Sequence, residues 1–311
     1  MTLLARGQRL IELQSFGLVL EDAESGERME LPVAAVSTPD ATECYDVVLV
    51  AVRSEQLSST LPMLTAMTDG SDVVFFGNTQ GRSAQLVHEL GSRAMFGFPA
   101  AGGTQEGHVV RYVLISQQKT MLGEASGEPS ARARTLQRTL EGAGFSVAIS
   151  PHLDRWLLAH AAFVVPIAFA LYGHDTNALR LAADRSGVRT MVRATREGFR
   201  ALRAAGNAAI PTNLRILYLW MPETFAARYW QKVLRTPRGE LWFAAHSRAA
   251  PEEMRSLADN LLAEVPRTGR APRPHWSGCC SANALVRRCH CRSADGSWVG
   301  FSERGRASPA S

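Results

Sequence analysis

Short apolar runs alternate with amphipathic stretches along the first half of the chain. The runs are rich in Val, Ile and Phe, which is typical of strands that are buried on both faces. Five of them lie at residues 46–52, 71–76, 94–98, 109–115 and 145–149. Stretches with helical spacing lie between some of the runs, for example at 83–90 and 131–140. This alternation predicts an α/β domain with a parallel sheet over residues 1–150.

The pattern becomes helical after Pro151 and predicts a second domain over residues 151–266. Residues 156–172 are apolar almost all round, with His160 and Pro166 as interruptions. This run is short for a membrane span, so we expect a buried helix at the centre of an α-helical domain. Residues 186–205 and 251–262 show the spacing of amphipathic helices.

Regular periodicity ends near residue 267, and we interpret 267–311 as an irregular tail. Between Pro266 and Ser311 eight arginines face only Asp295 and Glu303, so the tail carries more positive charge than the whole chain's net +5. A charge excess confined to a tail argues against a nucleic-acid-binding groove. A shifted reading frame would also explain this composition.

Four of the five cysteines lie in the tail, at 279, 280, 289 and 291, and only Cys44 lies in the body. With His290 they could hold zinc, but adjacent cysteines fit the usual C-x₂₋₄-C spacing poorly, so we expect no metal site. A body with one cysteine is typical of a reducing compartment. Because residues 1–10 do not resemble a secretory leader, we expect a cytoplasmic protein.

The order of signals over about 85% of the chain resembles the ketopantoate reductase family, which has a Rossmann-like domain and a helical domain like that of 6-phosphogluconate dehydrogenase. Four stretches carry the resemblance, supported by the spacing of Gly123-Glu124 and Gly142-Ala-Gly-Phe145. They are Thr2-Leu-Leu-Ala-Arg-Gly7, Val47-Val-Leu-Val-Ala-Val-Arg-Ser-Glu-Gln56, Phe75-Phe-Gly-Asn-Thr-Gln-Gly81, and Trp156-Leu-Leu-Ala-His160 through Pro166.

The resemblance implies hydride transfer from NADPH to a 2-oxo acid, with ketopantoate as the best-known substrate. Three residues follow strand ends, where open α/β sheets bind ligands, and we expect them to bind the cofactor. Arg6 suits a 2′-phosphate because a guanidinium can bind phosphate through two hydrogen bonds. Arg53 takes the place of a family lysine. Asn78 could hold both the nicotinamide and the substrate carbonyl, which makes it our catalytic candidate. A solvated arginine, a structural ion pair and a turn residue are the respective alternatives.

The Gly-rich fingerprint of dinucleotide-binding domains is not found in the sequence. A Rossmann domain normally opens with a first strand and G-x-G-x-x-G, whereas this sequence opens at what looks like strand two. The family's first strand lies inside the sheet, so its absence should leave two strand edges unpaired. By this comparison we interpret the chain as an N-terminally truncated member of the family whose reading frame begins upstream.

The family lysine that protonates the substrate carbonyl falls on Leu158, and its asparagine one turn later falls on Ala162. Leucine cannot donate a proton, and such electrostatic help is commonly worth about 3–4 kcal/mol. His160 is two residues on, about 200° around the helix, so it should face away from the lysine direction. We therefore expect a hydrogen-bonded core histidine there, with rescue by His160 as the alternative. Glu253 and Ser247 are the nearby residues that match the family's later carboxylate and serine in type.

Together these observations predict a reductase of 2-oxo acids that uses NADP(H), with activity impaired in the chain as written. Besides the small-molecule substrate, a second copy in a homodimer is a possible partner, whereas a nucleic acid or a membrane is not expected. The alternative is a non-catalytic, oligomeric binding protein derived from the same family. A tail-driven adaptor for zinc or nucleic acid is a third hypothesis that the composition disfavours. Lysine, which the family's chemistry needs, occurs only at Lys119 and Lys232.

Overall fold

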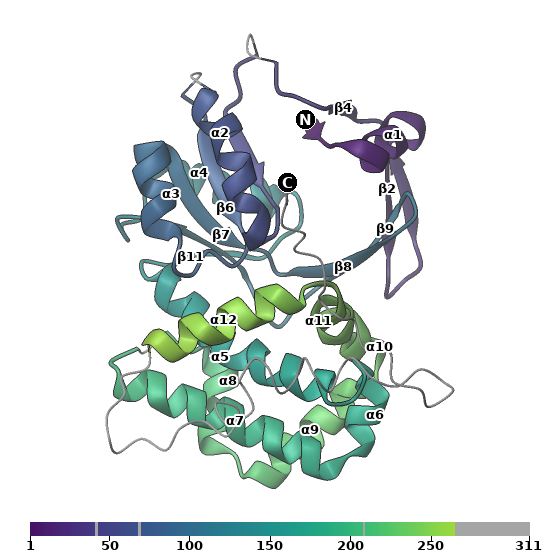
Figure 1. The fold of residues 1–311 in the computed structure, drawn as a ribbon, viewed down its shortest axis with the longest axis vertical. Helices are drawn as coiled ribbons and strands as arrows, with labels where there is room; N and C mark the ends of the chain where they lie inside the picture. The colour runs from purple at the N-terminus through teal and green to yellow at the C-terminus, as the bar shows by residue number, and fades with distance from the viewer. Residues whose placement is uncertain (41–42, 68–69, 208, 265–311) are drawn as a thin grey trace, which may run out of the picture. The chain divides into compact units, whose positions relative to one another are not determined.

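A computed structural model describes residues 1–40, 43–67, 70–207 and 209–264 (Figure 1). Strands and their covering helices occupy the chain as far as Ile149, and helices follow from Leu153 onward. This arrangement confirms the predicted fold class, in which a Rossmann-like α/β region precedes an all-α region. The tail and its cysteines lie outside the described residues. Within the described residues, no group of His, Cys, Asp and Glu is arranged to hold a metal ion.

A five-stranded sheet forms the centre of the α/β region, in the order β11-β10-β7-β6-β5. Its strands β5, β6 and β7 run parallel, as do β10 and β11, whereas β7 and β10 are antiparallel. Their bounds are Val47–Val50 for β5, Asp72–Phe76 for β6, Ala94–Phe98 for β7, Thr120–Glu124 for β10 and Val147–Ile149 for β11. Four of these strands lie within the predicted apolar runs.

Helices cover both faces of this sheet, which explains why its strands are continuously apolar. The first face packs against α2 (Leu57–Ala66) and α3 (Ser83–Leu90), and the second against α4 (Ala131–Gly142) (Figure 1). Side chains of successive strand residues point to opposite faces, so Val73 and Phe75 join the first core and Val74 joins the second.

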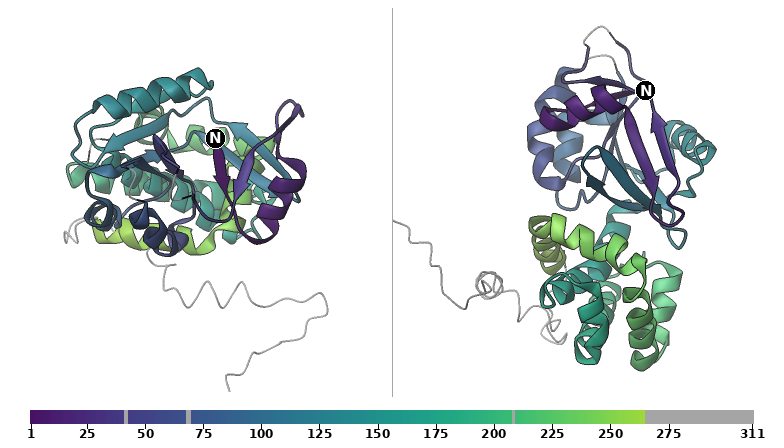
Figure 2. Two further views of the ribbon diagram at one scale, coloured as in Figure 1. Left: turned by 90° about the horizontal axis from the view of Figure 1, so that it is seen from above. Right: turned by 90° about the vertical axis from the view of Figure 1, so that its right-hand side faces the viewer.

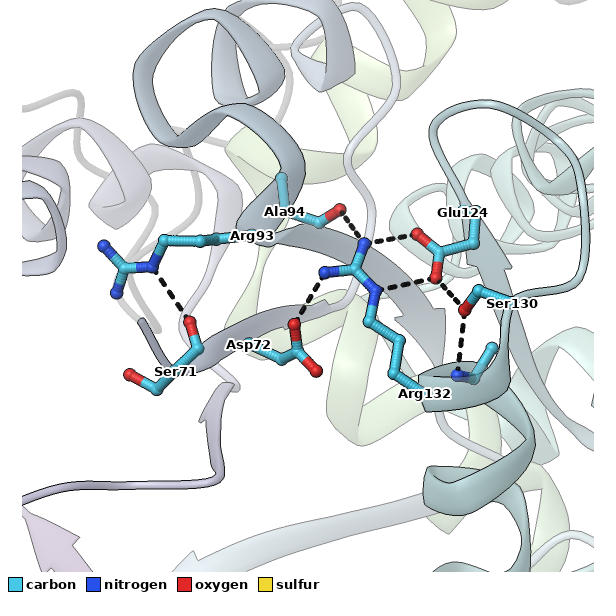
Figure 3. Close-up of polar contacts among 8 residues, drawn as sticks. Ser71, Asp72, Arg93, Ala94, Glu124, Ser130 and Arg132 are labelled. Atoms are coloured by element: carbon cyan, nitrogen blue, oxygen red, sulfur yellow. Dashed lines mark hydrogen bonds and ion pairs between the residues drawn. The ribbon is translucent and has the colours of Figure 1, made fainter. Parts of the chain in front are cut away.

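An arginine on α4 ties three strands of the sheet together (Figure 3). Arg132 donates to both carboxylate oxygens of Glu124 on β10, over 2.8 and 2.5 Å. It also donates to Asp72 on β6, over 2.6 Å, and to the carbonyl oxygen of Ala94 on β7, over 3.3 Å. Ser130, which caps α4, donates its hydroxyl to Glu124 as well.

The remaining strands form two smaller sheets. In the first, β1 (Thr2–Leu4) and β4 (Ala34–Val36) pair in parallel, with α1 (Gly7–Phe16) following β1. The second has the order β3-β2-β9-β8, whose bounds are Arg28–Leu31 for β3, Leu18–Asp22 for β2, Val109–Leu114 for β9 and Ala101–Glu106 for β8. The run at 109–115 is therefore a strand as predicted, but it lies outside the five-stranded sheet.

The two-stranded sheet and the five-stranded sheet are not joined by strand pairing within the described residues. Within the described residues, β1 pairs only with β4, and β5 pairs only with β6. Apolar side chains of both strands are exposed, namely Leu4 of β1 and Val47 and Leu49 of β5. The absence of a first strand stays a prediction.

The helices of the second region gather around α5 (Leu153–Tyr172), as Figure 2 shows in teal to yellow. Its main partners are α7 (Arg185–Ala204) and α12 (Pro251–Glu264). The chain between α5 and α12 also forms α6 (Ala178–Ala183), α8 (Thr212–Arg215), a π-helical turn (Ile216–Trp220), α9 (Glu223–Leu234), α10 (Pro237–Gly239), a second π-helical turn (Glu240–Ala244) and α11 (Ala245–Ala249). Among the described helices only α5 is long and apolar enough to cross a membrane. Twelve of its residues are buried within the protein, which confirms the predicted core helix.

Candidate functional site

A cavity of about 1200 Å³ lies between the carboxyl ends of β5, β6 and β7 and the helical region. The residues that follow these strands line one wall, and residues of α5 and the segments after it line the other. Most of the lining is apolar or aromatic, and only a few polar and charged side chains reach it. These include Arg53, Asn78, Lys119, His160, His246 and Glu253. This is the edge at which open α/β sheets bind their ligands.

Asn78 and Glu253 form a polar pair on the cavity wall. Asn78 follows β6, and Gly77 before it has a φ of 152°, which favours glycine and turns the chain out of the strand. The Asn78 amide donates to Oε1 of Glu253 over 2.6 Å, and Glu253 is only 7% exposed in the first turn of α12. A helix N-terminus favours a carboxylate. The amide oxygen of Asn78 is buried and has no hydrogen-bond partner among the described residues.

Arg53 also lines the cavity, at the N-cap of the short helical turn Ser54–Gln56 that follows β5. It donates from Nη1 to the carbonyl oxygen of Ala249 over 2.6 Å, which joins the sheet to the end of α11. The guanidinium has further N–H groups, and the side chain is exposed, so it can also bind an anion at the mouth of the cavity.

Arg6 is not among the residues that line this cavity. It lies at the N-cap of α1 after β1, as the sequence predicts, and its side chain is exposed. Because β1 belongs to the separate two-stranded sheet, the structure brings Arg53 and Asn78 together but leaves Arg6 outside the cavity. Binding of a 2′-phosphate by Arg6 stays a prediction.

The face that α5 presents to the cavity carries Trp156, His160, Phe163 and Val164. Leu158, where the resemblance places the family's lysine, is not on this face. The sequence argument that residues 158 and 160 point in opposite directions agrees with this placement. The cavity, however, lies on the side of His160.

Aromatic rings surround the His160 imidazole. It stacks on Trp156 with ring centroids 5.3 Å apart and lies 4.3 Å from the ring of Phe98. Burial, with a smaller contribution from the charge of His246, lowers the pKa of His160 from 6.5 to about 3, so the imidazole is neutral at physiological pH. The expectation of a hydrogen-bonded core histidine is wrong for the described chain, where His160 has ring contacts but no hydrogen-bond partner.

The remaining sequence candidates differ in their positions. Ala162 is fully buried against Gly198 of α7 and does not line the cavity. Ser247 is also buried outside the lining, and its carbonyl oxygen accepts a hydrogen bond from Tyr172. Lys119 and His246, which the sequence gave no reason to place here, do line the cavity.

Comparisons with known proteins agree with this description. Residues 1–127 match the sequence profile of the family described as ketopantoate reductase PanE/ApbA. No curated protein matches the chain by sequence.

Several solved structures share the fold. A 2-dehydropantoate 2-reductase from Methylococcus capsulatus superposes with a TM-score of 0.63 and 15% identity, covering 95% of this chain and 92% of its own. The corresponding enzyme from Geobacter metallireducens GS-15 gives 0.59 and 16%, with 84% and 98% covered. A D-mandelate dehydrogenase, solved with NADH and anilino(oxo)acetate, gives 0.56 and 12%, with 85% and 89% covered. At these identities the likeness shows the fold.

Proposed function

We propose that this chain is a slow reductase of the ketopantoate reductase family, whose profile matches residues 1–127, and that it binds NADP(H) and a 2-oxo acid in the cavity described above. The observation that carries the proposal is the Asn78–Glu253 pair at the carboxyl end of β6. Asn78 lines a mostly apolar cavity, and its amide oxygen is buried without a partner among the described residues, so a small shift of the side chain would let a ligand satisfy it. Bound NADPH would supply the hydride.

The residues present fit the nicotinamide end of the cofactor. The N–H groups of the nicotinamide carboxamide can donate a hydrogen bond to the amide oxygen of Asn78. Glu253 holds the Asn78 amide in place, because the bond between them fixes the side chain's orientation. Arg53, at the mouth of the cavity, supplies positive charge for a phosphate or for the substrate's carboxylate.

A 2-oxo acid also suits the cavity. Its carboxylate can pair with Arg53 or Lys119, which are the cationic arginine and lysine side chains on the lining, while its side chain contacts the aromatic wall. We expect slow turnover because the leucine at 158 cannot stabilise the charge that develops on the carbonyl oxygen. Ketopantoate and 2-oxo acids with larger apolar side chains are the substrates to compare.

Oxidation of NADPH by ketopantoate and by phenylpyruvate, followed by absorbance, tests the proposal, with NADH as the alternative cofactor. Glu253→Gln removes the charge that holds Asn78 and should lower turnover about tenfold or more, and its matched control is the exposed neighbour Glu252→Gln, which should have no effect. Cofactor fluorescence measures NADPH binding separately. A stable oligomer that neither binds nor oxidises NADPH would refute the reductase and favour the non-catalytic alternative.

A further inference from the structure

His160 is a polar ring on the cavity lining to which the family resemblance gives no role. His160 lies on the cavity face of α5, between Phe98 and Trp156, and the described residues provide no hydrogen bond to either of its nitrogens. The ring is half-buried and lines the cavity, so a ligand there can reach it. Such a ligand could form the hydrogen bond that the described residues do not provide.

The protonation state of the ring decides which ligand atom it can bind. Burial, together with the nearby charge of His246, lowers the pKa of His160 to about 3, so the ring carries one N–H donor and one acceptor nitrogen at neutral pH. A neutral imidazole can donate to a carbonyl oxygen without itself bringing a charge into the apolar cavity. The charged and titratable groups that share the lining are Arg53, Tyr112, Lys119, Tyr229, His246 and Glu253.

We propose that His160 donates a hydrogen bond to the carbonyl oxygen of the 2-oxo acid, in place of the lysine that the family uses. This inference rests on the proposed function for the identity of the ligand. His160 of α5 and Asn78 at the end of β6 line the same cavity, so we place the carbonyl group between them. As negative charge develops on the oxygen, the same N–H stabilises it, and the charged Arg53 and Lys119 are available for the carboxylate.

The aromatic side chains next to His160 also hold its ring in one orientation. The ring planes of Trp156 and His160 are nearly parallel, with an angle of 10° between them. The ring of Phe98, at the end of β7, also contacts the imidazole. Stacking fixes the plane of the imidazole and therefore the direction of its N–H. It follows that phenylalanine at position 160 should keep the packing and remove only the hydrogen bond.

Oxamate, an unreactive 2-oxo acid mimic, allows binding to be tested without turnover. Calorimetry should show that His160→Phe weakens oxamate binding by about fivefold to twentyfold, as expected for the loss of one hydrogen bond. His160→Gln retains a donor and should lose less affinity. The control His88→Gln, which changes an exposed histidine of α3, should bind like the parent. Thermal melting should show that all three variants are folded.

NMR of protein labelled with ¹⁵N-histidine gives a second measurement. The resonance that is missing in His160→Phe identifies the ring, and oxamate should shift its N–H signal and slow its exchange with water. Equal oxamate affinity in His160→Phe and the parent would overturn the inference, as would an unchanged His160 signal or a parent chain that does not bind oxamate with or without NADP⁺. If oxamate binding depends on His160 but NADPH is not oxidised, the reductase proposal fails and the carbonyl contact stands.

Discussion

The arginine that joins three strands to α4 allows a quantitative test of what holds the sheet together (Figure 3). Arg132→Met keeps the aliphatic length of the side chain and removes the guanidinium. The change leaves the Glu124 carboxylate, whose side chain is only 6% exposed, with Ser130 as its remaining partner. Asp72 loses its ion pair as well.

Removing one partner of a fully buried ion pair typically destabilises a protein by about 3–5 kcal/mol. Arg132 and Asp72 keep 27% and 25% of their side chains exposed, so solvent screening reduces this figure. We expect the free energy of unfolding to fall by about 2–3 kcal/mol at neutral pH, which is a large fraction of a domain's stability.

The pH dependence follows from the pKa of Glu124. Burial by itself would raise this pKa, but hydrogen bonds from Arg132 and Ser130 outweigh burial and hold the pKa below its ordinary value of 4.5. A lowered folded-state pKa stabilises the protein at pH values above the unfolded pKa, and this stabilisation is lost as the pH falls through the folded pKa. The difference between parent and variant should therefore be largest near neutral pH and should shrink below about pH 4.5.

Urea unfolding followed by circular dichroism at neutral and acidic pH measures both quantities. Arg138→Met is the matched control on the same helix, because Arg138 is exposed and, among the described residues, its side chain donates only to Thr135. It should change stability by no more than about 0.5 kcal/mol. An Arg132→Met penalty as small as that of the control, or one that stays constant with pH, would refute the reasoning.

Two further changes test the packing of α5 and the unpaired strand edge. A Cβ at Gly123 would lie 2.7 Å from the Cβ of Leu153, so Gly123→Ala should destabilise the protein by about 1–3 kcal/mol in urea unfolding, whereas Gly142→Ala, which meets open space, should not. Leu49 on the edge of β5 is 52% exposed, and Leu49→Lys should reduce self-association in light scattering, because charged side chains protect strand edges. The control Leu179→Lys, at an exposed helical position, should leave association unchanged, and equal association in parent and Leu49→Lys would contradict the edge argument.

Much of the sheet could be predicted from the sequence because buried parallel strands need continuous apolar runs. The strand at Val47–Val50 and the one at Asp72–Phe76 show this directly. The strand Thr120–Glu124 was missed because it ends in Gly123 and Glu124, which look like turn residues until Arg132 provides the carboxylate with a partner. The strand Val109–Leu114 was assigned to the wrong sheet because its partner in β2 lies about 90 residues earlier in the chain.

Only some residues of the candidate site could be predicted from the sequence. Arg53 and Asn78 could be predicted from strand ends, since the carboxyl ends of neighbouring parallel strands meet at one edge. Glu253 could only be named as a residue of suitable type, because its bond to Asn78 joins positions 175 residues apart. For His160, helical periodicity showed that it points away from Leu158, but the side on which the cavity lies depends on tertiary packing.

That packing determines which residues of α5 can take part in chemistry. Ala162 approaches Gly198 so closely that a Cβ on Gly198 would lie 3.3 Å from the Ala162 side chain, and Leu153 occupies the space that Gly123 leaves open. These two close approaches lock the rotation of α5 about its axis, so Leu158 cannot turn to the cavity without breaking both. Among the residues of α5, the hydrogen-bond donor that we propose at the carbonyl end lies on the face that carries His160. A neutral imidazole stabilises a developing alkoxide less than an ammonium group would. This is the physical reason for proposing that turnover is slow although the side chains that would bind the ligand are present.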